Sequence, residues 1–544
     1  MKSGLRAVIA RLRAVVSAPW ARNHRLGLAL IVAGSVLTLA VAACGPSPVT
    51  LTLGPRIDYL PPWYLPAGRI KLGEWVAVPA LWLALCLGAV GLYVCWRAVN
   101  SGWRPNNRRL FLLGSLLSVL TSLVPAMTSA DVLMYAAYGR LQVLGLNPYD
   151  ITPAEIFRQE YDPLLIWTER PWQDTPSVYG PVASASQWLA AWLGNGNMHD
   201  TVFWLQMFAL LPFLVIGALA VLLAHDDHKI QTRAILFTVL NPLMIWSVLA
   251  GAHNEAFTLV FAIVGLYFIR RSPFVAGLGI GLAGTVKVSL IFYGIAMAWG
   301  YRRDWRKLVQ LALGAAIPLG IAYGLLMPRA LLAASRNTGY ISAGSWAPPV
   351  QWVLTLVFGD PIARGIIGWG GWVMMAAVVW MLSRVMPWRL VPGVPEDEDP
   401  RRDPLTIAVR TAAILTASWL VTSPYTLSWY DLTTWVPLGL MVASRLDVIM
   451  IWRGFWLSIA YVTGRSVQFS DAMKSTGSVI RDGFCAGAQI LVLVLIVHWW
   501  WTWGHELPAW TRRLRSRGAD TERAETHPTI QGAVNPTVVR RGSA

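Results

Sequence analysis

An acidic residue follows directly on a long apolar block in this sequence. Asp131 stands in the string Thr128-Ser129-Ala130-Asp131, immediately after that block. A carboxylate at such a position can accept a proton from a hydroxyl nucleophile or hold a metal ion. An acid at a helix end is also often a simple N-cap, so Asp131 alone does not define a site.

Further polar residues lie within or between apolar blocks. Lys287 lies inside one block, and His253, Asn254 and Glu255 lie together between two others. Such groups are costly in lipid, so we expect them to face protein or a water-filled cavity. An ammonium there needs an anionic partner, either a lipid phosphate or a buried acid. A satisfied cap is the structural alternative for the His-Asn-Glu run.

Aromatic residues accompany several turn signals. The strings are Gly145-Leu146-Asn147-Pro148-Tyr149-Asp150, Ser177-Val178-Tyr179-Gly180-Pro181, and Ser423-Pro424-Tyr425 with Trp429-Tyr430-Asp431. Gly and Pro alone explain such turns, and interfacial aromatic residues are most often membrane anchors. Sugar-binding loops, however, also combine aromatic faces with amide and carboxylate groups.

The elements that must position these residues are membrane helices. The 544 residues are 55% hydrophobic and 13% charged, with 30 Trp, and the apolar residues come in blocks of about 20, the length that crosses a bilayer. Soluble domains would show amphipathic stripes instead. We predict an all-α polytopic membrane protein with about 12–14 membrane helices. Candidate spans are 27–44, 73–95, 110–128, 200–224, 234–250, 255–269, 308–326, 364–383, 408–423, 432–444, 448–464 and 486–503.

The net charge of +17 reports membrane topology. The basic residues cluster in short segments between apolar blocks, and no basic face is interleaved with aromatic residues, so we expect no nucleic-acid partner. Their distribution places both termini in the cytoplasm of a multi-pass cell-membrane protein. We predict three parts of the chain: a cytoplasmic tail at 1–26, a membrane domain at 27–504 and a cytoplasmic tail at 505–544, which we expect to be disordered. Outer loops at 129–199 and 327–363 carry short interfacial helices.

The apolar segment 274–300 does not fit a simple span. Both of its flanks are basic and are expected in the cytoplasm, but 27 residues are too few for two crossings. We predict a pair of half-helices that enters the membrane and returns, with Lys287 near the apex.

The four cysteines indicate neither a metal site nor a disulfide framework, because no pair has ligand spacing. The string Val41-Ala42-Ala43-Cys44 resembles a lipoprotein cleavage site. An uncleaved first helix is favoured because further spans follow.

Several of these strings, in order between about residues 110 and 440, resemble one family. They are 131–138 with 145–149, Tyr179-Gly180-Pro181, Asn241-Pro242 with His253-Asn254, Val286-Lys287, and Ser423-Pro424 with Trp429-Tyr430. Together they resemble the polyprenol-phosphomannose-dependent α-1,6-mannosyltransferases of actinobacterial cell envelopes, which have the C-type glycosyltransferase fold. Each string alone is a weak signal.

The resemblance implies a polyprenyl-phosphate-mannose donor and inverting transfer to the 6-hydroxyl of an α-1,6-mannan or lipomannan acceptor on the outer face. It makes Asp131 the catalytic base, while Lys287 would neutralise the departing phosphate. Glu255 stands where the family more often has Asp. The implied substrate-binding set is Tyr135, Asn147, Tyr149, Tyr179, His253, Asn254, Lys287, Trp429 and Tyr430. We expect no metal and no other cofactor, with a divalent-cation requirement left open.

Three alternatives remain. A related C-type enzyme that transfers another polyprenyl-phosphate sugar, such as arabinofuranose, would share the acid and the phosphate site. A lipid-linked sugar flippase or transporter would favour internal repeats, and none is evident. An inactive scaffold would lack the acid, whereas Asp131 is present.

Overall fold

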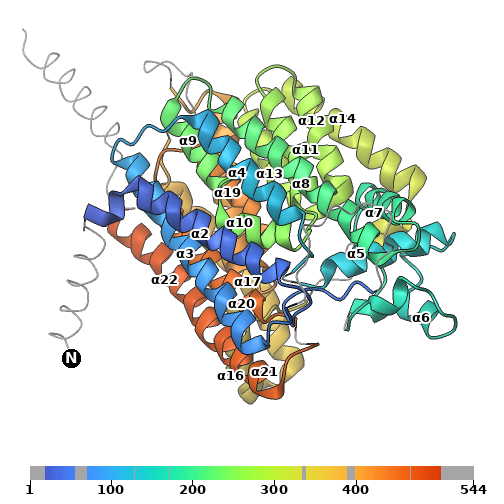
Figure 1. The fold of residues 1–544 in the computed structure, drawn as a ribbon. Helices are drawn as coiled ribbons and strands as arrows, with labels where there is room; N and C mark the ends of the chain where they lie inside the picture. The colour runs from blue at the N-terminus through green and yellow to red at the C-terminus, as the bar shows by residue number, and fades with distance from the viewer. Residues whose placement is uncertain are drawn as a thin grey trace, which may run out of the picture.

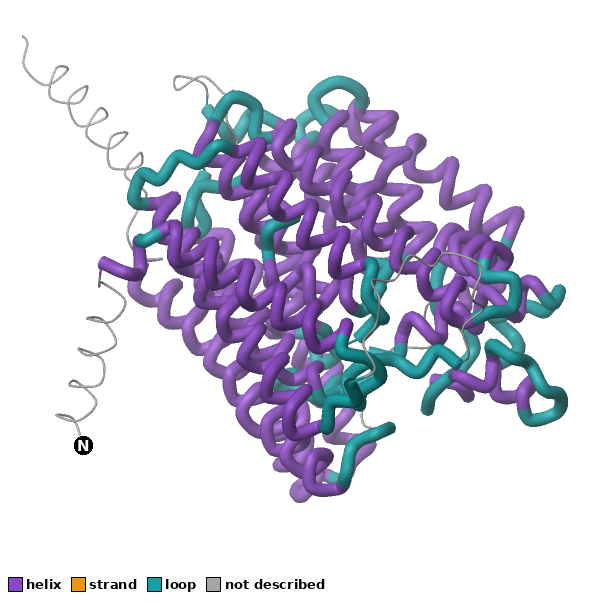
Figure 2. The backbone as a smooth tube through the Cα atoms, in the orientation of Figure 1, coloured by secondary structure: helices purple, strands orange, loops and turns teal. Residues whose placement is uncertain are grey.

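The computed structural model describes residues 19–54, 70–127, 129–170, 172–333, 339–388, 399–465 and 467–503. Within these ranges the chain is helical, and its only extended pairing is an isolated bridge between Thr50 and Met127 (Figure 2). The predicted all-α fold is confirmed. Residues 1–18 of the predicted N-terminal tail and the whole of 505–544 lie outside the described residues.

Eight helices of the described ranges are long and apolar enough to cross a membrane, and they lie in one bundle (Figure 1). They are α2 (His24–Ala43), α3 (Glu74–Asn100), α8 (Met198–Leu223), the segment His228–Ala250 that contains α9, α10 and η4, α14 with η6 (Trp305–Leu326), α17 (Asp360–Val385), α18 (Pro404–Thr422), and α21 to α22 (Asp471–Trp503). Four shorter apolar helices accompany them: α11 (Glu255–Phe268), α12 (Pro273–Val286), η5 with α13 (Val288–Gly300) and α16 (Ala347–Phe358). The chain is a multi-pass membrane protein.

Three predicted spans have other bounds in the structure. The span expected at 110–128 is α4 (Asn107–Ser122), and that at 448–464 is α20 (Arg445–Val462). The span expected at 432–444 is α19 (Leu432–Gly439), whose eight residues are all buried. A helix of that length extends only about 12 Å, well short of the hydrocarbon thickness, so α19 packs inside the bundle and does not cross it.

Helices α12 and α13 form the predicted hairpin, with Lys287 at the break between them. Helix α14 runs parallel to α12, because Gly277 contacts Leu311 and Gly281 contacts Ala315. The chain must therefore return along α13 before α14 begins. The Tyr301 hydroxyl, just after α13, donates to the Ile269 carbonyl, just before α12, which places both ends of the hairpin together.

The two predicted outer loops contain short helices. Segment 129–199 forms α5 (Asp131–Val143), α6 (Pro153–Phe157), η2 (Leu165–Trp167), η3 (Trp172–Asp174) and α7 (Pro181–Leu193). These helices form a lobe beside one end of the bundle, on the right in Figure 1. Segment 327–363 contains α15 (Arg329–Ala333), α16 and the first turn of α17.

Buried ion pairs hold the segments that reach the lobe end of the bundle. Arg453 on α20 pairs with Asp431 of η7 (Ser428–Asp431), and both side chains are fully buried. Arg453 also donates to the Leu420 carbonyl at 2.9 Å and to the Thr426 hydroxyl at 2.5 Å. These bonds fix the segment that precedes α19, which carries Trp429 and Tyr430.

Candidate active site

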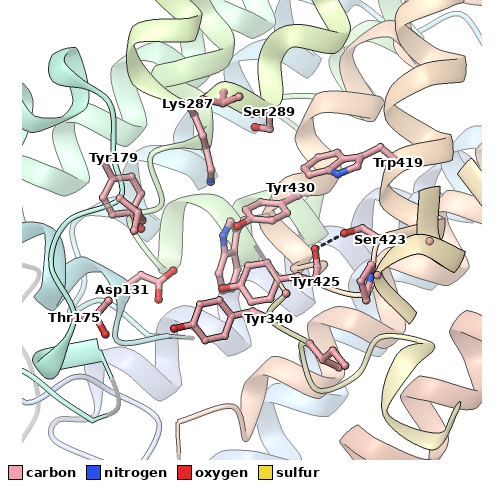
Figure 3. Close-up of a pocket in the computed structure, with 18 of the residues that line it drawn as sticks. Asp131, Thr175, Tyr179, Lys287, Ser289, Tyr340, Trp419, Ser423, Tyr425 and Tyr430 are labelled. Carbon is pink, nitrogen blue, oxygen red and sulfur yellow. Dashed lines mark hydrogen bonds between the residues drawn. The ribbon is translucent and has the colours of Figure 1, made fainter. Parts of the chain in front are cut away.

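One cavity of about 410 Å³ lies where the lobe meets the bundle. Its walls come from α5, the segment before α7, the Lys287 break, residues 339–341, α17, and the segment from α18 to η7. In Figure 3, Asp131 and Lys287 point into the same space from different elements, with aromatic rings around them. Segments far apart in the sequence therefore build one site.

Asp131 is the first residue of α5, where a carboxylate is favoured by the helix dipole. Its Oδ2 lies 3.6 Å from Nδ1 of His253. Burial raises the pKa of Asp131, and so does the negative charge of Glu255, while Lys287 and Ser129 lower it; the resulting pKa is about 6. A carboxyl group with that pKa is ionised at neutral pH and is a stronger base than an ordinary aspartate.

His253 is fully buried and stacks on Trp429, with ring centroids 3.6 Å apart and ring planes inclined by 13°. Burial, aided by the charge of Lys287, lowers the pKa of His253 well below its usual range. The ring is therefore neutral, and its contact with Asp131 is not an ion pair. The preceding residue, Ala252, has φ of +51°, a left-handed conformation that costs a non-glycine residue about 1–2 kcal/mol. This strain turns the chain so that His253 faces Asp131.

Lys287 forms an ion pair with the buried carboxylate of Glu255, the first residue of α11. Its ammonium also lies 4.2 Å from the ring centroid of Tyr430. The acidic partner considered from the sequence is thus present. Because an ammonium carries three donors and Lys287 lines the cavity, this pairing leaves donors that can reach a bound anion.

Aromatic residues from the predicted set form the lobe side of the cavity. The ring of Tyr179 meets that of Tyr135 edge to face, with centroids 5.1 Å apart. The Gly180 amide donates to the Val286 carbonyl at 3.1 Å, and a Cβ at Gly180 would collide with the Thr285 carbonyl. The Tyr-Gly-Pro string therefore lets the start of α7 dock directly against the end of α12.

The structure does not bring all predicted residues to the cavity. Asn147 accepts a hydrogen bond from the Tyr149 amide at 3.0 Å and donates to Asp150 at 2.9 Å, which makes it an Asx-turn residue. Tyr149 is buried beside α15, and its hydroxyl donates to the Tyr179 carbonyl at 2.9 Å. Asn254 lies behind the cavity, next to a small void near Tyr135. These residues support the walls, whereas Asp131, Tyr135, Tyr179, Lys287, Trp429 and Tyr430 line them.

Other lining residues were not in the predicted set. Tyr340 and Tyr425 lie with ring centroids 6.2 Å apart, and Trp419 stacks on Tyr430 at 5.7 Å. Arg364 of α17 also borders the cavity. Tyr425 and Trp419 flank the Ser423-Pro424 turn, which the sequence singles out. Their position beside that turn could have identified them as cavity residues. No local pattern marks Tyr340 or Arg364.

No group of three or more His, Cys, Asp or Glu side chains is placed to hold a metal ion within the described ranges. The metal-independent site expected from the sequence stays a prediction.

The fold and the site define a multi-pass membrane protein in which an acid and a lysine line one shared cavity. The chain belongs to the α-(1→6)-mannopyranosyltransferase family, because residues 24–302 match the family described as "Alpha-(1->6)-mannopyranosyltransferase, N-terminal domain". The resemblance found in the motifs is thereby confirmed at the level of the family.

Individual relatives bear the same kind of name. The chain is 26% identical over 421 residues to a Mycolicibacterium smegmatis protein named "Probable alpha-(1->6)-mannopyranosyltransferase", a match that covers 74% of this chain and 65% of the relative. It is 24% identical over 281 residues to alpha-(1->6)-mannopyranosyltransferase B of Corynebacterium glutamicum, covering 48% of this chain and 46% of the relative. The matches thus span less than two thirds of these relatives. No solved structure gives a significant match.

Proposed function

We propose that this chain transfers mannose from polyprenyl-phosphate-mannose to an α-1,6-mannan or lipomannan-type acceptor, with inversion at the anomeric carbon. Asp131 is the general base, and Lys287 binds the phosphate of the donor. The observation that carries the proposal is that a carboxylate with a pKa of about 6 and a lysine line one cavity.

The surroundings of the cavity suit a lipid-linked donor. The cavity wall includes Val288, next to Lys287 in the sequence, and Trp372 of α17. These side chains are 53% and 61% exposed, respectively, on helices that are apolar enough to meet lipid. A polyprenyl chain can therefore stay in the bilayer while its phosphate reaches Lys287.

The proposed reaction follows from this arrangement. Asp131 takes the proton of the acceptor 6-hydroxyl as that oxygen bonds to the anomeric carbon of mannose. The bond from the anomeric carbon to the phosphate oxygen breaks, and polyprenyl phosphate leaves with the electron pair. Lys287 offsets the negative charge that develops on the leaving oxygen. Attack from the face opposite the phosphate converts a β-linked donor into an α-linked product.

Tyr135, Tyr179, Trp429 and Tyr430 are proposed to contact the sugars, since they line the cavity. His253 is a positioning residue, because its neutral ring contacts Asp131 and is held by Trp429. We propose that Asn254, Asn147 and Tyr149 do not contact the substrate and instead hold the residues that line the cavity in place.

The cavity is proposed to face the outside of the cell. The opposite end of the bundle carries basic residues, among them Arg270, which pairs with Asp403, and Arg302, which donates to the Arg401 carbonyl. Basic residues favour the cytoplasmic side, which puts the Asp131 end outside and both termini inside.

The test is transfer of labelled mannose from synthetic mannosyl phosphopolyprenol to an α-1,6-linked mannose disaccharide in isolated membranes. We expect Asp131→Asn to lower the rate by about 10²–10⁴-fold, because the base is lost. Asp174→Asn is the matched control: it makes the same change in the same lobe, on an acid that pairs with Arg158 at the surface.

The outcomes separate the parts of the proposal. A mannose-labelled product with an α-1,6 linkage, lost in Asp131→Asn only, supports the donor, the linkage and the base together. Equal loss in both variants would remove Asp131 as the base. A wild-type protein that ignores this donor and uses arabinofuranosyl phosphopolyprenol would reassign the sugar.

A further inference from the structure

A second hollow, of about 590 Å³, lies on the lobe away from the catalytic cavity. It is bordered by Arg140 of α5, Tyr161 of the loop after α6, Trp167 of η2, Trp192 near the end of α7, and Asn195 and Asn197 of the turn before α8. We call it the lobe hollow. It shares no lining residue with the catalytic cavity.

One helix connects the two sites. Asp131 is the first residue of α5, and Arg140 lies nine residues further along the same helix, a rise of about 14 Å. Helices α5 and α7 pack together (Figure 1), and residues at the C-terminal end of each line the hollow. The lobe hollow therefore lies at the far end of the helix that begins with Asp131, about 14 Å away along its axis.

The cationic group of the hollow is held in place and already neutralised. Arg140 Nε donates to Asp162 at 2.8 Å, and Asp162 in turn accepts from the amides of Leu164 and Leu165 at 2.9 Å. The two terminal nitrogens of Arg140 donate to no protein group in the described part of the chain, and Nη1 lies towards Gly196. A fixed guanidinium with open donors suits hydroxyl oxygens.

The aromatic residues supply apolar faces beside these donors. Tyr161 is 74% exposed and Trp192 is 59% exposed. The ring of Trp167 packs against Gly54, from the segment before α3, which closes one side of the hollow. Sugar rings present C–H faces to aromatic rings and hydroxyl edges to polar groups, so this combination favours a carbohydrate.

The charges favour a neutral ligand over an anion. Asp162 matches Arg140, and Asp200 lies in the first turn of α8, where it offsets the positive end of that helix. We propose that the lobe hollow binds a neutral oligosaccharide, namely the part of the acceptor chain that extends from the catalytic cavity. That this oligosaccharide is a mannan rests on the proposed function.

The experiment measures binding of an α-1,6-linked mannohexaose to the purified full-length protein in nanodiscs by isothermal titration, without donor. We expect Trp192→Ala and Tyr161→Ala each to weaken binding by about tenfold, the loss of one good contact. Trp188→Ala is the matched control, because Trp188 stacks beside Trp192 on α7 but does not line the hollow. In transfer assays, the two lining variants should also remove any preference for long over short acceptors.

The competing occupant is membrane lipid, which the exposed tryptophans of α7 can also meet. If lipid occupies the hollow, Trp188→Ala and Trp192→Ala should lower the unfolding temperature in phosphatidylglycerol nanodiscs by similar amounts. Both variants should then bind mannohexaose as the wild type does, and that result would overturn the proposal. Equal binding by wild type and both lining variants also overturns it. If Trp192→Ala misfolds, Tyr161→Ala decides the matter alone, since its side chain is mostly exposed.

The readouts keep this inference apart from the proposed function. Binding that is lost in the lining variants supports the hollow even if the wild type transfers no mannose. If the wild type transfers mannose to the disaccharide but the lining variants bind mannohexaose as well as the wild type does, the proposed function stands and the proposed binding at the lobe hollow is overturned.

Discussion

Two aspartates near the lobe end of the bundle differ in how their charge is matched. Asp431 pairs with Arg453, whose remaining contacts are the Leu420 carbonyl and the Thr426 hydroxyl. Among the described residues Asp131 has no Lys or Arg within ion-pair distance: its Oδ2 lies 3.6 Å from the neutral ring of His253, and its side chain is 23% exposed. Burial raises the pKa of both acids to about 6, so the difference between them is access. Asp431 is enclosed by its ion pair and fixes backbone segments, whereas Asp131 faces the cavity and can take a proton from a bound hydroxyl group.

The largest expected effect on stability comes from breaking the matched pair. Arg453→Met leaves Asp431 buried without its cation and should lower the free energy of unfolding by about 3–5 kcal/mol. Denaturant unfolding in detergent micelles measures this. Asp131→Asn is the comparison variant and should stay within about 1 kcal/mol of the wild type, because it removes no strong partner. Similar losses in both variants would contradict the distinction between the two aspartates.

The second prediction concerns Lys287, which both pairs with a buried acid and lines the cavity. Lys287→Met should lower kcat by about 10²–10³-fold, since the charge near the leaving phosphate is lost. It also leaves Glu255 buried without a cation, so stability should fall as well. Adding Glu255→Gln should restore stability but not kcat. Recovery of both in the double variant would make Lys287 a purely structural partner of Glu255.

The smallest effect is on pH dependence. The base must be ionised, and the pKa of Asp131 is raised to about 6, so kcat/KM should fall about tenfold per pH unit below that value and level off above it. Rates of transfer between pH 4.5 and 8 provide the profile. The residual activity of Asp131→Asn should lack this acidic limb. A profile that stays flat through pH 6 would argue that another group takes the proton.

Much of the architecture could be predicted because lipid imposes simple rules on sequence. The hairpin around Lys287 followed from two basic flanks and a stretch too short for two crossings. The length of a helix was less predictable where the helix is surrounded by protein and does not contact lipid. Helix α19 is buried along its whole length, so its apolar residues reflect packing and do not mark a crossing.

The site was predictable where a residue type is unusual for its surroundings. Asp131 and Lys287 stood out as charges at the ends or interior of apolar blocks, and both line the cavity. Asn147 stood out equally, but its side chain completes a local turn, which composition cannot distinguish from ligand binding. Tyr340 reaches the cavity through the long-range placement of the segment before α16, and no local spacing encodes that.

The hairpin also has a consequence for how the protein is made. A half-helix whose end carries an ammonium cannot rest in lipid on its own, because its open backbone and its charge require protein around them. Glycines of α12 contact α11 and α14, so these two helices are the protein that surrounds the half-helix. Lys287 can therefore take its place only after α14 has been synthesised and inserted. We therefore expect the lysine that is proposed to bind the donor phosphate to reach its site late in biogenesis, through tertiary assembly in the membrane.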